Sequence, residues 1–146
     1  GTDDATTPVH RADLACVSTG RLIYIDDDEV NRELMRAFLG LRPGLTVELA
    51  ADGPSGLAMA ARTRPDALLI DMMMPGMDGL QVLHAVRADT TLRATPCIAV
   101  SANAMPAEVQ AALAAGFDGY LTKPLSADVL LHEIDRIVGA RWASPG

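Results

Sequence analysis

Short apolar runs alternate with amphipathic segments along the chain from Arg21 onward. The run Ala67–Ile70 is apolar at every position, which is typical of a central strand covered on both faces. Residues 45–50 instead alternate between apolar and polar side chains, as a half-buried strand does. The runs predict five strands, at residues 22–25, 45–50, 67–70, 97–100 and 120–122.

The segments between these runs carry helical patterns. After the first run, apolar side chains recur at four-residue steps and form a stripe, at Val30, Leu34 and Phe38. Arg42-Pro43-Gly44 then ends that helix. Pro54 and Pro106 each suit the first position of a helix. Further apolar positions predict helices around residues 82–86, 106–116 and 130–138.

Strands that alternate with helices predict a parallel sheet with right-handed crossovers. Five such units predict an α/β fold, the flavodoxin-like, doubly wound (βα)5 sandwich with the parallel strand order 2-1-3-4-5. We expect this domain to span residues 20–140. Residues 1–19 are rich in Thr, Asp, Ala and Pro and are expected to form a linker or disordered arm, and residues 141–146 a tail.

The composition narrows the classes of function. The chain has 146 residues, of which 49% are hydrophobic, so one domain with a sizeable core is expected. Its net charge of -7 argues against direct nucleic-acid binding. No apolar run approaches the roughly 18 residues that cross a membrane, so no membrane contact is expected. Cys16 and Cys97 lack metal-ligand or redox spacing, which indicates reduced thiols and a cytoplasmic location.

Polar residues stand at the end of four predicted strands. Asp26 and Asp27 follow the first strand, Asp71 the third, Ser101 the fourth and Lys123 the fifth. Ligands of open α/β sheets bind at the carboxyl ends of the strands. We therefore expect these side chains to converge on one edge of the sheet.

Three carboxylates in one cleft stay ionised only beside a compensating cation. Oxygen ligands and few protein groups favour Mg²⁺. With the ammonium of Lys123 and the hydroxyl of Ser101 nearby, the set around Asp71 suits a phosphoryl group. The acidic run that begins at Asp26 has an alternative interpretation as a capped, acid-rich start of a helix.

Residues 21–139 resemble the receiver domain of response regulators in two-component signalling. The matching segments are LIYIDDDEVNRELM, ADGPSGLAMA, ALLIDMMMPGMDGLQVL, CIAVSANA and AAGFDGYLTKPL. The resemblance implies that Asp71 is the phosphoacceptor. It also implies that Asp27 binds Mg²⁺ directly, Asp26 mainly through water, and Met73 through its backbone carbonyl. Lys123 would pair with the phosphoryl group and precede a cis peptide bond to Pro124.

The same resemblance implies a function in a phosphorelay. The domain would take its phosphoryl group from a histidine kinase or a histidine phosphotransfer protein, and would catalyse only its own phosphorylation and dephosphorylation. Ser101 and Tyr120 would act as the switch. The face at residues 106–139 would report the change, and a homodimer through this face is a further expectation. The chain is also expected to be the terminal receiver of a hybrid histidine kinase.

Two positions depart from the common family pattern. Ser101 stands where threonine is frequent, and it lacks the methyl group that restricts the rotamer. Met73 stands where polar side chains also occur, and a thioether cannot orient a water molecule for hydrolysis of an aspartyl phosphate.

Three alternatives remain at the level of the sequence. A magnesium-dependent phosphatase with an aspartyl nucleophile would often have a second acid at the position of Met73. A flavin carrier would need a Ser/Thr/Gly-rich phosphate loop where Asp27-Asp28-Glu29 stand. A degenerate receiver that takes no phosphate is disfavoured by the complete set of Asp, Ser and Lys residues.

Overall fold

The computed structural model describes residues 20–139, so the predicted arm and tail lie outside the described part. Its strands are β1 (Gly20–Ile25), β2 (Leu45–Ala50), β3 (Ala67–Asp71), β4 (Cys97–Ser101) and β5 (Gly119–Thr122). Its helices are α2 (Glu29–Leu39), α3 (Gly53–Thr63), α4 (Gly79–Ala88), α5 (Pro106–Ala115) and α6 (Ala127–Ile134), followed by the π-helical turn η1 (Asp135–Gly139). All paired strands are parallel, in the order β2-β1-β3-β4-β5. The predicted fold and strand order are confirmed.

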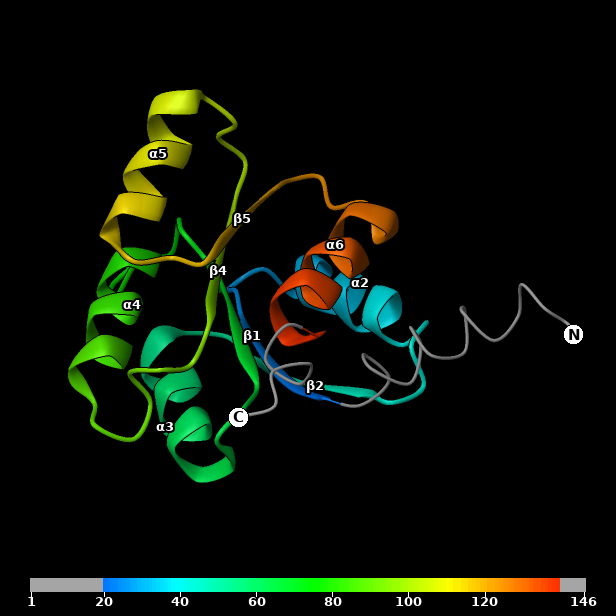
Figure 1. Cartoon of the computed structure of the whole chain (residues 1–146), viewed down its shortest axis with the longest axis horizontal. Helices are drawn as coiled ribbons and strands as arrows, with labels where there is room; N and C mark the ends of the chain where they lie inside the picture. Colours follow the sequence, from blue (N-terminus) through cyan, green and yellow to red (C-terminus); the bar gives the residue numbers. More distant parts are fainter. Residues whose placement is uncertain (1–19, 140–146) are drawn as a thin grey trace, which may run out of the picture.

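The sheet lies between two layers of helices (Figure 1). Helices α3, α4 and α5 lie on one side of it, and α2 and α6 lie on the other. Every residue of β3 and β4 is buried, as expected for strands covered on both faces. This arrangement leaves the carboxyl ends of the strands as the open edge of the sheet.

Short polar side chains begin most of the helices. Asp28, Asp52, Asp78 and Ser126 each accept a hydrogen bond from a backbone N–H of the first turn that follows. Helix α5 instead begins with a proline and has no side-chain cap. These local signals fix where each crossover helix starts and therefore where each loop of the open edge ends.

The apolar stripe of α2 predicts the helix but not its buried face. Val30 is 74% exposed and Leu34 37% exposed, whereas Met35 and Leu39 are buried against β1 and α6. Both pairs have the four-residue spacing of a helix, so periodicity alone does not distinguish them. Val30 and Leu34 of the stripe therefore face outward, whereas its third residue, Phe38, is partly buried and packs against the same core as Met35 and Leu39.

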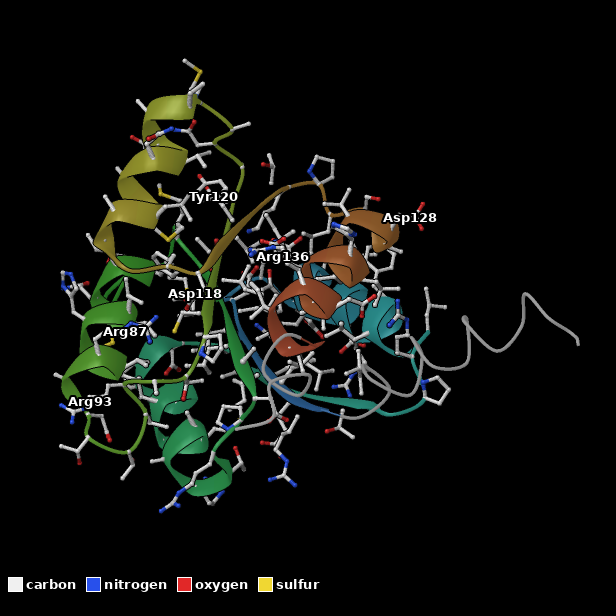
Figure 2. All side chains as sticks on the ribbon, viewed as in Figure 1. Arg87, Arg93, Asp118, Tyr120, Asp128 and Arg136 are labelled. Atoms are coloured by element: carbon white, nitrogen blue, oxygen red, sulfur yellow. The ribbon has the colours of Figure 1, made fainter. Side chains whose placement is uncertain are left out.

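An arginine ties the amino-terminal ends of β4 and β5 together. The Arg87 guanidinium donates hydrogen bonds to the carbonyl oxygens of Thr95 and Gly116 and lies 3.0 Å from the Asp118 carboxylate. The same carboxylate accepts the N–H of Cys97; Figure 2 labels Arg87 and Asp118. These contacts lie at the opposite end of the sheet from the open edge, where they hold the two strands in register.

Two expectations about the chain's environment can be compared with the structure. No helix between residues 20 and 139 is long and apolar enough to cross a membrane. Cys97 is a buried free thiol, and burial raises its pKa to about 12, so the thiol is protonated. Cys16 lies outside the described residues.

Candidate functional site

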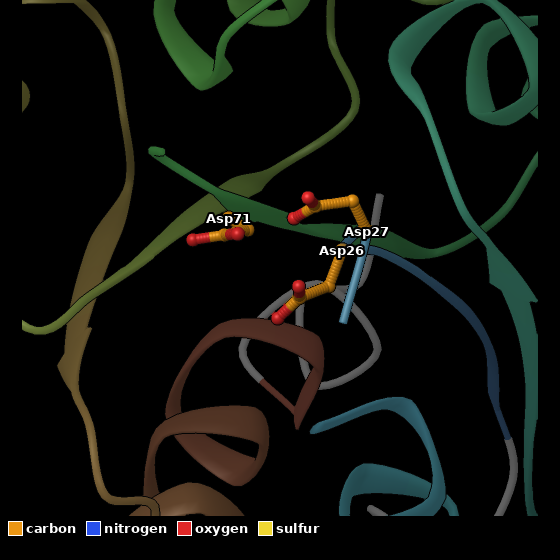
Figure 3. A group of neighbouring side chains, drawn as sticks. All are labelled: Asp26, Asp27 and Asp71. Atoms are coloured by element: carbon orange, nitrogen blue, oxygen red, sulfur yellow. The ribbon is translucent and has the colours of Figure 1, made fainter. Parts of the chain in front are cut away.

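The open edge of the sheet gathers three carboxylates. Asp26 and Asp27 follow β1, and Asp71 is the last residue of the neighbouring strand β3. One oxygen from each lies within 4.8 Å of the other two (Figure 3). Asp26 and Asp71 are buried, whereas Asp27 is exposed. The structure therefore brings together the acids that the sequence placed at separate strand ends.

Lys123 directly follows the edge strand β5, and its side chain reaches the same cluster. Its Nζ lies 3.2 Å from Asp71 Oδ1 and 3.3 Å from Asp26 Oδ2. Its backbone N–H donates to the carbonyl oxygen of Ser101, which holds the end of β5 beside that of β4. Burial alone would lower the pKa of Lys123, but the charges of Asp26 and Asp71 raise it above its ordinary value. The lysine therefore stays cationic between the two acids. Its peptide bond to Pro124 is cis, as expected.

Asp26 is almost fully engaged by donors of the protein. Oδ1 accepts the N–H of Asp28 at 2.9 Å, and Oδ2 accepts the hydroxyl of Tyr24 in addition to the Lys123 ammonium. Burial would raise the pKa of Asp26, but these hydrogen bonds and the lysine charge together lower it. Sequence reasoning missed Tyr24. A signal was present, because residues two apart along a strand point to the same face.

Asp71 lies in a less favourable electrostatic environment. Burial, followed by the negative charge of Asp26, raises the pKa of Asp71 despite the Met73 N–H and the Lys123 ammonium. Both of these donors contact Oδ1, at 3.3 Å and 3.2 Å. Within the described part of the chain, no hydrogen bond to Oδ2 is found. Oδ2 is therefore free to ligate a cation or to act as a nucleophile.

The donor set fits a hard divalent cation. Asp27 offers an exposed carboxylate without a hydrogen-bond partner among residues 20–139, and Asp71 offers Oδ2. Carboxylate oxygens in a partly open site that leaves room for water are the ligands that Mg²⁺ prefers. The net negative charge of three acids against one lysine gives such an ion an electrostatic reason to bind.

Ser101 and Tyr120 are joined through one loop residue. The Ser101 Oγ accepts the backbone N–H of Asn103 at 3.0 Å, and the Asn103 carbonyl accepts the hydroxyl of Tyr120 at 2.6 Å (Figure 2 labels Tyr120). Sequence reasoning identified both hydroxyls but not Asn103. The two contacts use only the backbone atoms of Asn103, so they do not depend on its residue type.

A mostly apolar cavity of ≈ 490 Å³ lies next to this relay. Ser101, Asn103 and Tyr120 contribute to its walls, together with Met73 and several alanines of α5. Most of the α5 side chains are exposed, and Ala112 is its one buried residue. The loop after β4 therefore has space beside it into which side chains can move.

The loop after Asp71 is held close to the site by a glycine. A Cβ at Gly79 would lie 2.7 Å from the Cα of Met72 and 2.8 Å from the carbonyl oxygen of Asp71. Only glycine allows the start of α4 to approach the backbone at the end of β3 so closely. The side chain of Met73 points outward from this loop and is 76% exposed.

The raised pKa of Asp71 predicts how stability varies with pH in the cation-free protein. A folded-state pKa above the ordinary value of 3.8 means that the stability contributed by Asp71 is fully present below that value. It is then lost as the pH rises through the folded pKa. Asp71→Asn removes this titration. We therefore expect the free energy of unfolding of this variant, measured in urea with a chelator, to increase relative to that of the parent as the pH rises from acidic to neutral. A difference that does not change with pH would contradict this expectation.

Comparison with known proteins places this geometry in a family. Residues 22–135 match the response regulator receiver domain. Response regulator MprA of Mycobacterium leprae is 43% identical over 114 residues, which are 78% of this chain and 49% of that protein. The chemotaxis protein CheY4 of Vibrio cholerae has a similar structure, with a TM-score of 0.75, 31% identity and coverage of 82% of this chain and 98% of that one.

A receiver domain from a different kind of protein is equally similar. The receiver domain of sensor histidine kinase PA1611 from Pseudomonas aeruginosa matches with a TM-score of 0.75 and 33% identity, over 83% of this chain and 98% of that one. That structure holds a magnesium ion in its active site cleft.

The chain belongs to the response regulator receiver domain family. It is thus a receiver domain of two-component signalling, a class of domain that works with histidine kinases or phosphotransfer proteins. The chain spans about half the length of the curated relatives that it matches.

Proposed function

We propose that this domain, expected to span residues 20–140, accepts a phosphoryl group on Asp71 from a phosphohistidine of a kinase or phosphotransfer protein, with Mg²⁺ as cofactor. One observation carries the proposal: a buried carboxylate with one free oxygen lies between a lysine ammonium and an exposed second carboxylate. Asp27 and Asp71 would hold the cation directly, with the backbone carbonyl of Met73, and Asp26 would act mainly through water.

The proposed reaction needs little covalent chemistry from the protein. One carboxylate oxygen of Asp71 attacks the phosphorus, a P–O bond forms, and the P–N bond breaks with its electron pair going to the histidine nitrogen, which takes up a proton. Bound Mg²⁺ would neutralise part of the charge on the transferring group. Lys123, already 3.2 Å from Asp71, would take one phosphoryl oxygen and balance the remaining charge.

The proposed conformational switch depends on the oxygens that a phosphoryl group would bring to the site. A phosphoryl group on Asp71 offers acceptors to the Ser101 hydroxyl, which at present accepts the N–H of Asn103. When Ser101 turns toward the phosphoryl group, the Asn103 backbone follows, and with it the carbonyl that holds Tyr120. The adjacent cavity gives this movement space. The face formed by α5, β5 and α6 would carry the change to a partner or to a second copy of the domain.

Similarity extends both to a response regulator and to the receiver of a sensor histidine kinase. A receiver domain of this kind therefore occurs in both classes of protein, and a hybrid kinase as the host protein stays a hypothesis. By itself the domain would catalyse only its own phosphorylation and dephosphorylation.

The cation requirement tests this function. With a small phosphodonor and Mg²⁺, intact mass should increase by one phosphoryl group, and a chelator should prevent the increase. Without a phosphodonor, Mg²⁺ should raise the melting temperature by mass action. Asp27→Ala should remove most of this rise and, because repulsion among the acids is relieved, should not lower the stability of the cation-free protein.

Glu29→Gln is the matched control, since it removes an exposed acidic charge two residues farther along the chain. It should keep the response to Mg²⁺ of the parent. An equal rise in melting temperature in the parent and in Asp27→Ala would show that Asp27 does not hold the cation.

A further inference from the structure

Tyr24 is fully buried in β1, between the sheet and helices α2 and α6. A buried phenol needs a partner for its hydroxyl, and here the partner is the carboxylate of Asp26, two residues later. Burial, followed by this hydrogen bond, raises the pKa of Tyr24 far above its ordinary value, so the hydroxyl keeps its proton and acts as a donor.

This contact separates Asp26 from the two other acids. Three donors from three parts of the chain engage Asp26: the Tyr24 hydroxyl and the Lys123 ammonium on Oδ2, and the Asp28 N–H on Oδ1. Each carboxylate oxygen has about two lone-pair sites, so Oδ2 is filled. By contrast, the Asp27 carboxylate and Asp71 Oδ2 receive no hydrogen bond from residues 20–139.

The number of free carboxylates matters for the choice of cation. Mg²⁺ is small, keeps several waters and is typically held through one or two carboxylates. Ca²⁺ takes six to eight oxygens and gains from each additional or bidentate carboxylate. A site that presents two free carboxylates therefore favours Mg²⁺, and a site that presents three is better suited to Ca²⁺.

We infer that Tyr24 determines the cation specificity of this site: its hydroxyl occupies Asp26 Oδ2 and so withholds a third carboxylate from direct ligation. This inference rests on the proposed function, because it presupposes that the cluster binds a divalent cation. Tyr24 acts through Asp26 and touches neither the cation nor the acceptor, so it is a positioning residue.

Isothermal titration calorimetry of Tyr24→Phe with MgCl₂ and with CaCl₂, in the absence of any phosphodonor, tests the inference. The variant keeps the buried ring and loses only the hydroxyl. The ratio of the Ca²⁺ to the Mg²⁺ dissociation constant should fall on the order of tenfold, mainly through tighter Ca²⁺ binding, since a hydrogen bond to a charged group is worth about this factor. A role in packing alone would change the melting temperature but not this ratio.

Thr63→Val is the matched control. It also removes a hydroxyl, here a half-buried one that donates to the Met59 carbonyl at the far end of α3, and its ratio should equal that of the parent. In an Asp26→Ala background, Tyr24→Phe should leave the ratio unchanged, because the residue through which it acts is gone.

An unchanged ratio in Tyr24→Phe, or a shift that persists in the Asp26→Ala background, would overturn the inference while leaving the proposed function intact. A parent domain that binds neither cation would instead overturn the proposed function, and this inference with it. The two failures are therefore distinguished by the titration of the parent.

Discussion

Asp71→Asn is expected to accept no phosphoryl group, with a loss of labelling to the background of the assay. The amide keeps the shape of the side chain but lacks the anionic oxygen that would attack phosphorus. The raised pKa of Asp71 shows that its charge is held at a cost in the folded domain, so the neutral amide should fold at least as well near neutral pH. Intact mass after incubation with Mg²⁺ and a phosphodonor, together with far-UV circular dichroism, checks both expectations.

Asp78→Asn gives a matched control in the same loop. Asp78 caps α4 by accepting the N–H of Gln81, and asparagine serves almost equally well at this position. This variant should take up one phosphoryl group as the parent does. Phosphorylation of Asp71→Asn at another residue would contradict the assignment of the acceptor.

Ser101→Ala is expected to separate phosphorylation from its structural consequence. Asp71, Lys123 and the acids proposed to bind the cation remain, so the variant should still accept a phosphoryl group. The hydroxyl that would follow the phosphoryl oxygens is gone, and a charge-assisted bond of this kind contributes on the order of 1.5–3 kcal/mol. That amount tips a two-state equilibrium with a gap of a few kcal/mol, so its loss should abolish most of the response at residues 106–139.

The measurement is amide exchange or NMR chemical shift on α5, β5 and α6, with and without beryllofluoride as a stable mimic of the phosphoryl group. Ser101→Thr keeps the hydroxyl and should keep the response. Equal responses in the parent and in Ser101→Ala would show that this hydroxyl is not the trigger, even if Asp71 is the acceptor.

The two variants test different parts of the same arrangement. Asp71→Asn tests the carboxylate that would form the bond to phosphorus. Ser101→Ala tests the path from Ser101 through the Asn103 backbone to Tyr120. Because the cavity beside this path is bordered by Met73 and α5, a response that reaches α5 is the result that the geometry favours.

Much of this protein follows from the order of residues along the chain. Fully apolar runs such as Ala67–Ile70 identify central strands, and their alternation with helices fixes a parallel sheet whose strand order the structure confirms. The polar residues that follow these runs then fall on one edge, because parallel strands end on the same side. The order of residues therefore predicts that Asp26, Asp71 and Lys123 meet at this edge.

The tertiary structure decided what periodicity and residue type leave open. Val30 and Met35 lie on stripes of equal spacing, and only the packing of α2 against β1 and α6 buries the second and exposes the first. The hydrogen bonds of Asp26 with Tyr24 and Lys123 depend on side-chain rotamers and on a lysine nearly a hundred residues away. The sequence by itself determined which groups meet at the edge of the sheet. Only the folded chain decided which oxygens are occupied and which are free, because that depends on distances of a few ångströms between side chains that the pattern of residues does not encode.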